Sequence, residues 1–135
     1  EVFRLTVPPH SLLLTPPTQV ARRLLGSPVF EDPEGHPTQI GGPWTWLVKP
    51  GTAITPDGIV HIHHADYDEY MEDEWWRDHE HQHIWQYRQM RNQFLLAILL
   101  DYKDNGYDNS NLEKDANNWA NFLRDHPECR EKHLD

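Results

Sequence analysis

Residues 66–104 read DYDEYMEDEWWRDHEHQHIWQYRQMRNQFLLAILLDYKD, and this stretch decides the fold because it contains neither proline nor glycine. We predict one long helix over it, since side chains three or four positions apart then share a face. That face begins with histidines and ends with apolar side chains, and its members are Trp76, His79, His83, Tyr87, Met90, Phe94, Ala97 and Ile98. Two functional alternatives follow: a site carried by the histidines, or a docking surface that contains them.

A second, shorter helix is predicted over residues 111–124. Asn105 and Gly106 stop the long helix, and Ser110 and Glu113 have the spacing of a capping box. The apolar face of the second helix consists of Leu112, Ala116, Trp119, Ala120 and Leu123. A loop of about five residues favours an antiparallel helical hairpin in which the second helix covers the apolar end of the first.

The first part of the chain has a different composition, because ten of the eleven prolines lie before residue 57. Proline pairs hold a chain extended, so we predict a Pro-rich arm that includes a short helix over residues 18–25. Residues 30–43 are expected to be irregular, and residues 44–48 and 59–63 are expected to form a small β-hairpin. The predicted fold is therefore mainly α: an arm and hairpin over residues 1–64, and an acidic helical hairpin over residues 65–135, in a single structural unit.

Charge is distributed unevenly along the 135 residues. Residues 1–60 carry four basic and five acidic side chains, whereas residues 61–135 carry eight basic and seventeen acidic ones. This balance argues against nucleic acid as a direct ligand, which needs Lys and Arg for its phosphates, and favours a protein partner with a basic surface.

Three further features of the sequence bound the function. The single cysteine, Cys129, excludes an internal disulfide and a thiolate zinc cluster. The apolar run at residues 94–100 is too short for the roughly 20 residues of a membrane span. The chain begins at Glu1 instead of a methionine, from which we expect a processed N-terminus. The sequence does not indicate a cellular compartment.

One pattern points to metal chemistry. His79, Glu80 and His83 fit the spacing His-Glu-x-x-His, which on a helix places both imidazoles one turn apart. These five residues resemble the signature of the zincins, a group of zinc metallopeptidases. The resemblance implies that His79 and His83 are zinc ligands and that Glu80 is the catalytic general base. It also implies a third ligand from downstream, with Asp101, Asp104, Asp108 and Glu113 as the candidates.

A metal site without catalysis is a separate alternative. Asp68 and Glu72 fall near the helix face of His79 and His83, and His61 or His63 could join them from the hairpin. Imidazole and carboxylate ligands suit zinc, copper or nickel.

The docking alternative is the one that the sequence favours. Large rings and apolar side chains serve as buried anchors at protein interfaces, and the candidates are Leu12, Leu13, Leu14, Trp44, Trp46, Tyr67, Tyr70, Met71, Trp75 and Trp76. Acidic residues surround the anchors of the long helix and would face a basic partner. We therefore expect a non-catalytic accessory or structural subunit of a larger assembly, with no cofactor. A minimal zinc-dependent hydrolase is the alternative, and an acidic inhibitor that mimics nucleic acid is a third hypothesis.

Overall fold

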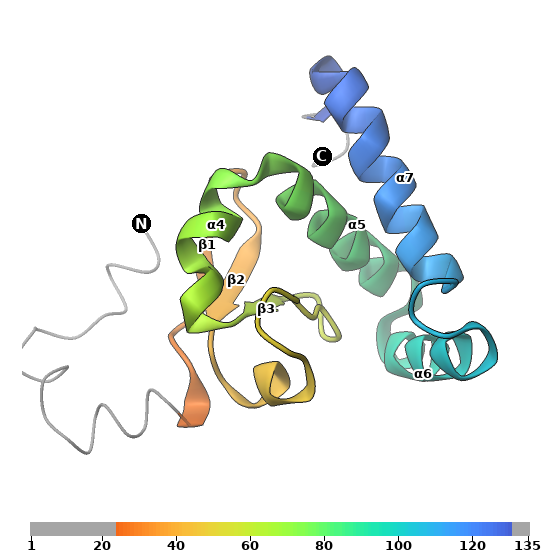
Figure 1. The fold of residues 1–135 in the computed structure, drawn as a ribbon, viewed down its shortest axis with the longest axis horizontal. Coiled ribbons are helices and arrows are strands. Elements are labelled where there is room, and N and C mark those ends of the chain that lie inside the picture. The colour runs from red at the N-terminus through yellow and green to blue at the C-terminus, as the bar shows by residue number, and fades with distance from the viewer. Residues whose placement is uncertain (1–23, 131–135) are drawn as a thin grey trace, which may run out of the picture. The chain divides into compact units, whose positions relative to one another are not determined.

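The computed structural model describes residues 24–130, and the predicted class, mainly α with a small β-element, is confirmed (Figure 1). The described residues divide into two compact units. The sheet unit contains the described residues up to Thr55 together with Ile59–Glu72. The helical unit contains Pro56–Gly58 and the described residues from Asp73 onward.

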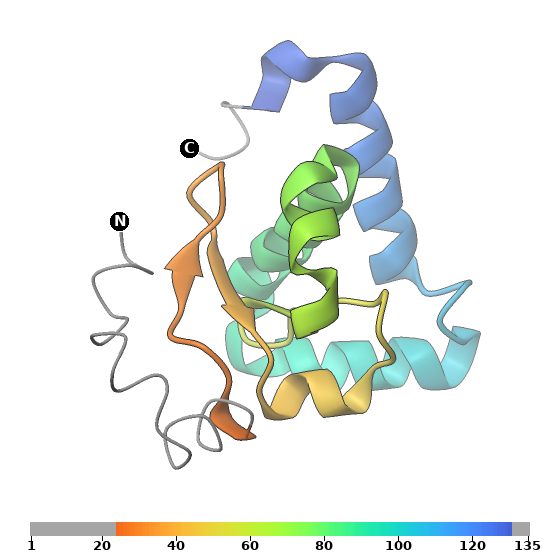
Figure 2. The same ribbon diagram turned by 60° about the vertical axis from the view of Figure 1, so that its left-hand side comes forward.

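A three-stranded sheet organises the sheet unit, with the strand order β1–β2–β3. Strand β1 (Phe30–Glu31) pairs antiparallel with β2 (Pro37–Ile40), and Figure 2 shows these two strands side by side. Strand β3 (Val60–Ile62) lies parallel to β2. Val60 and Ile62 are completely buried, so β3 supplies part of the core of the sheet unit.

The prediction of an irregular segment over residues 30–43 was wrong, because β1 and β2 form a hairpin there. Asp32 closes the turn between them, since its carboxylate accepts the backbone N–H groups of Glu34 and His36, each at 2.9 Å. Gly35 adopts a positive φ of 87° in the same turn. The turn-forming residues could be recognised in the sequence, but they form the turn between two short strands and do not make the whole segment irregular.

The prediction of a strand over residues 44–48 was also wrong. Pro43–Leu47 form a 3₁₀ helix, η1, which begins at a proline. A proline suits the first helical position because its missing N–H would have no partner there. The hydroxyl of Thr45 donates a hydrogen bond to the backbone oxygen of Gly42 at 2.6 Å, and this local bond stabilises the turn instead of a strand.

The predicted strand over residues 59–63 is confirmed as β3, but its predicted hairpin partner was wrong. Its neighbour in the sheet is β2, and His61 adds an isolated antiparallel bridge to Ile54. A short 3₁₀ helix, η2 (His64–Asp66), and helix α4 (Tyr67–Glu72) follow β3.

Three helices build the helical unit: α5 (Glu74–Met90), α6 (Phe94–Asn105) and α7 (Asn111–Asp125). A turn of 3₁₀ helix, η3 (Arg91–Gln93), joins α5 to α6, and another, η4 (Pro127–Cys129), follows α7. The predicted long helix therefore exists from Glu74 to Asn105, but as two α-helices joined by a 3₁₀ turn.

Two breaks divide the stretch that was predicted as a single helix. Asp73 has an extended backbone and caps α5, because its carboxylate accepts the N–H of Trp76 at 3.0 Å. Arg91 has a positive φ of 51°, which is uncommon for a residue with a side chain. The first break uses a good capping residue that the sequence offers, whereas nothing in the local sequence marks the second.

Helix α7 runs antiparallel to α5, which confirms the predicted helical hairpin (Figure 1). The indole N–H of Trp75, near the start of α5, donates to the side-chain oxygen of Asn121, near the end of α7, at 2.9 Å. The amide of Gln82, further along α5, donates to the carboxylate of Asp115, near the start of α7, at 2.8 Å. The buried side chains on the apolar face of α7 are Ala116, Ala120 and Leu123. Two alanines allow the helix backbones to approach closely, so that polar side chains of α5 and α7 can meet.

The prediction that the second helix covers the apolar end of the first was wrong. Helix α7 packs mainly on the histidine-bearing helix α5, and α6 runs in a different direction after the break at Arg91 (Figure 1). Phe94 is the buried residue of α6, while its leucines are 42–58% exposed, namely Leu95, Leu96, Leu99 and Leu100.

Several predictions lie outside the described residues. They are the first 23 residues of the predicted Pro-rich arm, with Leu12, Leu13 and Leu14, and all but the last two residues of the helix predicted over residues 18–25. Between residues 24 and 130, no helix is both long and apolar enough to cross a membrane.

Candidate metal centre

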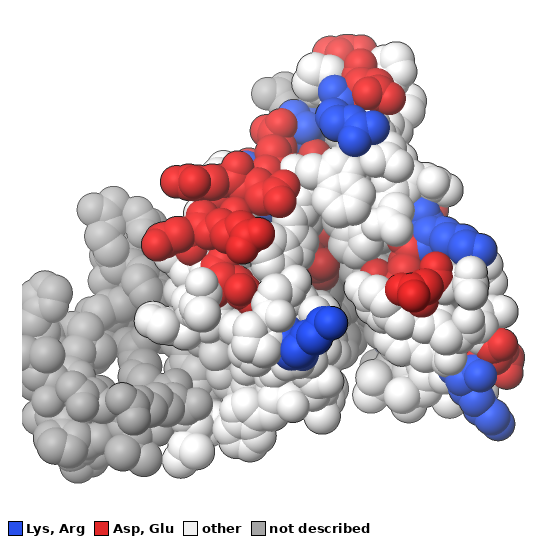
Figure 3. All heavy atoms as spheres, viewed as in Figure 1, with Lys and Arg blue, Asp and Glu red and all other residues white. Residues whose placement is uncertain are grey.

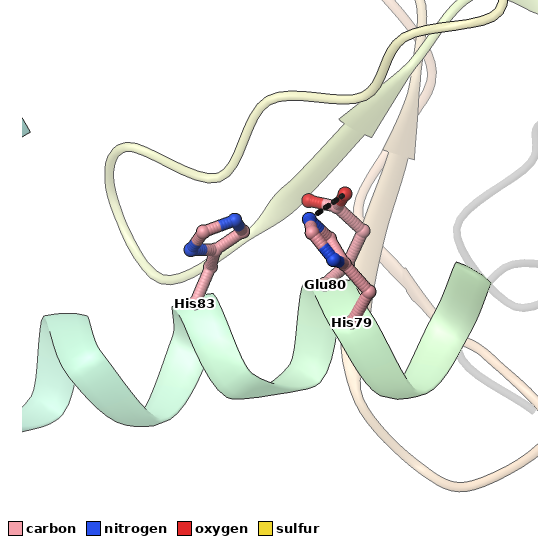
Figure 4. A group of neighbouring side chains, drawn as sticks. All are labelled: His79, Glu80 and His83. Atoms are coloured by element: carbon pink, nitrogen blue, oxygen red, sulfur yellow. Dashed lines mark ion pairs between the residues drawn. The ribbon is translucent and has the colours of Figure 1, made fainter. Parts of the chain in front are cut away.

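Three side chains of α5, His79, Glu80 and His83, bring potential ligand atoms within 4.8 Å of one another. Figure 4 shows both imidazole rings and the carboxylate on the same side of the helix, and the spacing of four residues accounts for the shared face of His79 and His83. All three residues are buried, with between 4% and 7% of their surface exposed. The Glu80 carboxylate lies 3.7 Å from Nε2 of His79. This distance is too long for a hydrogen bond, although the carboxylate is close to both imidazoles.

A fourth group reaches this cluster from α7. The carboxylate of Glu113 lies between the two imidazoles, with Oε1 at 3.1 Å from Nε2 of His79 and Oε2 at 3.1 Å from Nε2 of His83. Glu113 is itself 7% exposed. It is one of the four residues considered as a third metal ligand, and the structure brings it to the histidine pair.

Helix α6 fixes the start of α7 and therefore the position of Glu113. The carboxylate of Asp101 accepts the hydroxyl of Ser110 at 2.6 Å and the backbone N–H groups of Leu112 at 3.0 Å and Asn111 at 3.1 Å. Ser110 in turn accepts the N–H of Glu113 at 3.2 Å. These bonds satisfy the free donors of the first turn of α7.

The predicted capping box is formed only in part. Ser110 accepts the backbone N–H of Glu113 as predicted, but the N–H of Ser110 bonds to the backbone oxygen of Tyr107 at 3.2 Å. The Glu113 side chain turns instead to His79 and His83. A residue that reads as a helix cap in the sequence is thus part of the histidine cluster.

Gln86 sets the orientation of the His83 ring. Its amide nitrogen donates to the backbone oxygen of Leu112 at 3.1 Å and to the carboxylate of Asp115 at 2.9 Å, so its amide oxygen is left as an acceptor. That oxygen lies 2.8 Å from Nδ1 of His83, which must therefore be the donor. In the neutral ring Nε2 then carries a lone pair, and it faces an oxygen of Glu113. Two acceptors at 3.1 Å need a cation between them, either a proton or a metal ion.

Without a metal, the proton between His83 and Glu113 is bound tightly by His83. Burial lowers the pKa of His83, but the hydrogen bond to Glu113 and the charges of Glu80 and Glu113 outweigh it. Together with the bond to Gln86 they raise the pKa of His83 to about 9. His83 is therefore an imidazolium at neutral pH in the metal-free protein.

The same interactions act on the carboxylate and on two tyrosines. Burial raises the pKa of Glu113, yet hydrogen bonds from His79, His83 and Tyr102, with the charge of His83, bring it well below its usual value. Burial and the negative charge of Glu113 raise the pKa of Tyr102 and of Tyr107 far above their usual value. Both tyrosines stay protonated and can donate hydrogen bonds.

The arrangement of the donors fits a metal ion. Two ligand atoms bound to one zinc at about 2.0–2.2 Å, at a tetrahedral angle, lie about 3.3–3.6 Å apart. Oε1 of Glu113 lies 3.1 Å from Nε2 of His79 and Oε2 lies 3.1 Å from Nε2 of His83, so each imidazole faces a different oxygen, at a hydrogen-bond distance slightly shorter than this separation. Gln86 holds His83 through its other ring nitrogen, as outer groups do for metal-binding histidines. Nδ1 of His79 has no such partner within residues 24–130.

The remaining candidates for the third ligand have other roles or positions. Asp101 caps α7, and its four hydrogen bonds from Ser110, Leu112, Asn105 and Asn111 outweigh the effect of burial and lower its pKa to about 2. Asp104 and Asp108 are exposed.

The wider metal site predicted along one helix face is not formed as a continuous face. Asp68 and Glu72 belong to α4, which ends before the break at Asp73, and both are exposed. His61 and His63 have local partners in the sheet unit: Nδ1 of His61 lies 2.8 Å from the side-chain oxygen of Gln39, and Nε2 of His63 lies 2.7 Å from a backbone oxygen.

The predicted anchors of a docking surface differ in their exposure. Trp46 is 63% exposed and Tyr67 is 38% exposed, whereas Tyr70 is completely buried and belongs to the core. Trp44, Met71, Trp75 and Trp76 are half-buried. Acidic side chains gather at α4 (Figure 3), and the exposed ones there are Asp68, Glu69 and Glu72. The docking role stays a prediction.

Sequence reasoning missed three residues of the site, Gln86, Tyr102 and Tyr107. Gln86 follows His83 by three positions on a helix, so its proximity could have been inferred from the spacing. Tyr102 donates its hydroxyl to Oε2 of Glu113 at 2.8 Å. No local pattern places it there, because the contact depends on how α6 turns back to α7.

Comparison of the chain with family models, curated proteins and solved structures finds no match.

Proposed function

We propose that the protein is a small zinc-dependent hydrolase whose metal is held by His79, His83 and Glu113. The observation that carries this proposal is the position of the Glu113 carboxylate, 3.1 Å from Nε2 of each histidine. Two imidazoles and one carboxylate are a donor set of zinc enzymes that keep a further coordination position open.

Electrostatics support a divalent cation at this place. Two carboxyl groups, Glu80 and Glu113, are buried beside two imidazoles, and buried charges are stable only when they are paired. In the metal-free protein a proton on His83 compensates part of the negative charge. A zinc ion would replace that proton and interact with all four groups at once.

Each residue would have a distinct role in hydrolysis. When bound, zinc supplies Lewis acidity, which polarises a carbonyl group and makes a water molecule more acidic. Glu80 is buried next to the ligand atoms without occupying the position of Glu113, so it can accept a proton from that water as a general base. The protonated Tyr107, which is 52% exposed, is a donor near the same carboxylates; partial desolvation and the charges of Glu113 and Glu80 raise its pKa.

The likeness of residues 79–83 to the zincin signature makes a peptide bond the proposed substrate. The His-Glu-x-x-His spacing alone would be weak support, because this stretch is rich in histidine and acid. The additional support is that Glu113, 30 positions beyond His83, meets both histidines on a second helix.

The experiment compares the zinc-loaded wild-type chain with Glu80→Gln on a library of fluorogenic peptides. We expect the wild type to cleave peptides, and Glu80→Gln to retain zinc but to lose at least about 100-fold in rate, as for loss of a general base. Glu69→Gln is the matched control, because Glu69 is an exposed acid of α4, and it should cleave like the wild type. A wild-type chain that binds zinc but cleaves no peptide, or a Glu80→Gln variant with full activity, would contradict the hydrolase.

A further inference from the structure

The end of α6 carries a reactive pair of residues that the proposed function does not use. Asn105 is the last residue of α6, Gly106 follows it, and both are exposed. An asparagine before a glycine loses its side-chain amide readily, because glycine has no side chain to hinder attack by its backbone nitrogen. Among residues 24–130, no atom of a more distant residue lies within 4 Å of the position that a Cβ of Gly106 would take. The reacting atoms are therefore open to solvent.

The Asn105 amide belongs to the hydrogen bonds that join α6 to α7. Its Nδ2 donates to Oδ1 of Asp101 at 2.9 Å. The same Oδ1 accepts the backbone N–H of Asn111 at 3.1 Å, and Oδ2 accepts the hydroxyl of Ser110 at 2.6 Å. One carboxylate thus connects the end of α6 with the first turn of α7, the helix that carries Glu113.

We propose that Asn105 is a deamidation site whose product weakens the connection between α6 and α7. The backbone nitrogen of Gly106 attacks Cγ of Asn105, and the new C–N bond replaces the bond to the side-chain nitrogen. That nitrogen leaves as ammonia with the hydrogen of the Gly106 N–H. A water molecule then opens the succinimide ring and gives aspartate or isoaspartate. The net reaction consumes one water, releases one ammonia, involves no oxidation or reduction, and does not depend on the zinc site.

The last turn of α6 has to open before this reaction. In the closed turn the N–H of Gly106 donates to the backbone oxygen of Tyr102 at 2.8 Å, and the Asn105 amide is bonded to Asp101. Helix ends fray at little cost in free energy. We therefore expect Asn105 to react in the folded chain within about 10-fold of its rate in the urea-unfolded chain.

Deamidation replaces a stabilising contact by a repulsive one. Either product has a carboxylate where the amide of Asn105 donates to Asp101, and like charges four residues apart destabilise a helix. A negative charge at the C-terminal end of a helix is also unfavourable because of the helix dipole. Together with the lost hydrogen bond, these effects should lower the urea midpoint by about 0.5–1 M.

The first measurement follows the purified full chain over time by peptide mapping with mass spectrometry, in native buffer and in concentrated urea. Asn109 is the internal comparison, because it is exposed in the same loop but is followed by Ser110, whose side chain hinders the attack. Asn105 should convert before Asn109 under both conditions.

The second measurement is the urea midpoint of Asn105→Asp, which introduces the new charge without the reaction. We expect it to be lower than that of the wild type by about 0.5–1 M. Asn109→Asp is the matched control, because it adds the same charge just before α7, where the helix dipole favours it. This control should not lower the midpoint.

Each part of the inference can be refuted by itself. If Asn105 converts in urea but not in native buffer, or if Asn109 converts first, the modification site is refuted. If Asn105→Asp has the urea midpoint of the wild type, the weakened connection to α7 is refuted. Neither result bears on zinc binding or peptide cleavage, so failure here is distinct from failure of the proposed function.

Discussion

The buried ion pair of His83 and Glu113 predicts how the stability of the metal-free protein depends on pH. The pKa of His83 is raised from 6.5 to about 9 in the folded chain, so the folded state binds its proton more tightly than the unfolded state. The stabilisation is therefore fully present below about pH 6.5 and is lost as the pH rises through about 9.

The size of this effect follows from the shift. Each pKa unit corresponds to about 1.36 kcal/mol, so the free energy of unfolding should fall by about 3 kcal/mol across this range. Little is lost to solvent screening, because the side chains of His83 and Glu113 are each 9% exposed. The lowered pKa of Glu113 results from the same ion pair, so it adds no further change to the free energy of unfolding.

Urea unfolding in the presence of a strong chelator, at several values between about pH 6 and pH 9, measures this change. This pH range stays below the ordinary tyrosine pKa of about 10. Above that pH, the raised pKa values of Tyr102 and Tyr107 in the folded chain would lower the free energy of unfolding further. In Glu113→Gln the imidazolium loses its hydrogen-bonded carboxylate and keeps only the charge of Glu80 nearby, so most of the pH dependence should disappear. Asp108→Asn, a change at an exposed acid, should behave like the wild type. Parallel curves for the wild type and Glu113→Gln would refute the reasoning.

Two further predictions concern the residues that hold the helices of the site together. Asp101→Asn weakens the cap of α7 and should lower the free energy of unfolding by about 1 kcal/mol, whereas the exposed Asp104→Asn should not. Because the pKa of Asp101 is lowered to about 2, its contribution is present above about pH 4 and is lost as the pH falls towards 2, so the two urea curves should converge in acid. Arg130 binds both oxygens of the buried Asp78, at 3.1 and 2.9 Å, and Arg130→Ala should cost about 3 kcal/mol because it leaves this carboxylate unpaired. Arg124→Ala removes only an exposed pair and should change the urea midpoint little.

The helical unit was largely predictable from local sequence patterns. The pattern of apolar and capping residues predicted α7 correctly, with Ser110 as its cap. Helices α5 and α6 were found as one helix, because nothing in the sequence around Arg91 marks its positive φ. Because α6 changes direction at that break, α7 packs mainly on α5, and the prediction that α7 covers the apolar residues of α6 was wrong.

The sheet was harder to predict, because its strands are only two to four residues long. Such strands carry too few side chains for an alternating pattern. The parallel pairing of β2 and β3 joins residues 38 and 60, and no local signal specifies such a distant contact. Trp44 and Trp46 suggested a strand by their spacing, but Pro43 and the Thr45 side chain stabilise a 3₁₀ turn.

The site was predicted in part. His79, Glu80 and His83 could be found from their spacing alone, because one helix turn determines their geometry. Glu113 was one of four candidates, and its selection required the antiparallel packing of α5 and α7. Tyr102 could not be found from local sequence, since its contact combines the direction of α6 with the start of α7.

The most direct test of the account is the zinc content and zinc affinity of the purified chain, measured for the wild type, Glu113→Ala and the control His126→Ala. His126 is an exposed histidine after α7, so its loss should have no effect. We expect about one zinc per chain in the wild type and in the control, with affinity greatly reduced in Glu113→Ala. A wild type that binds no zinc, or a Glu113→Ala variant that binds it as tightly as the wild type, would contradict a metal centre built from both helices.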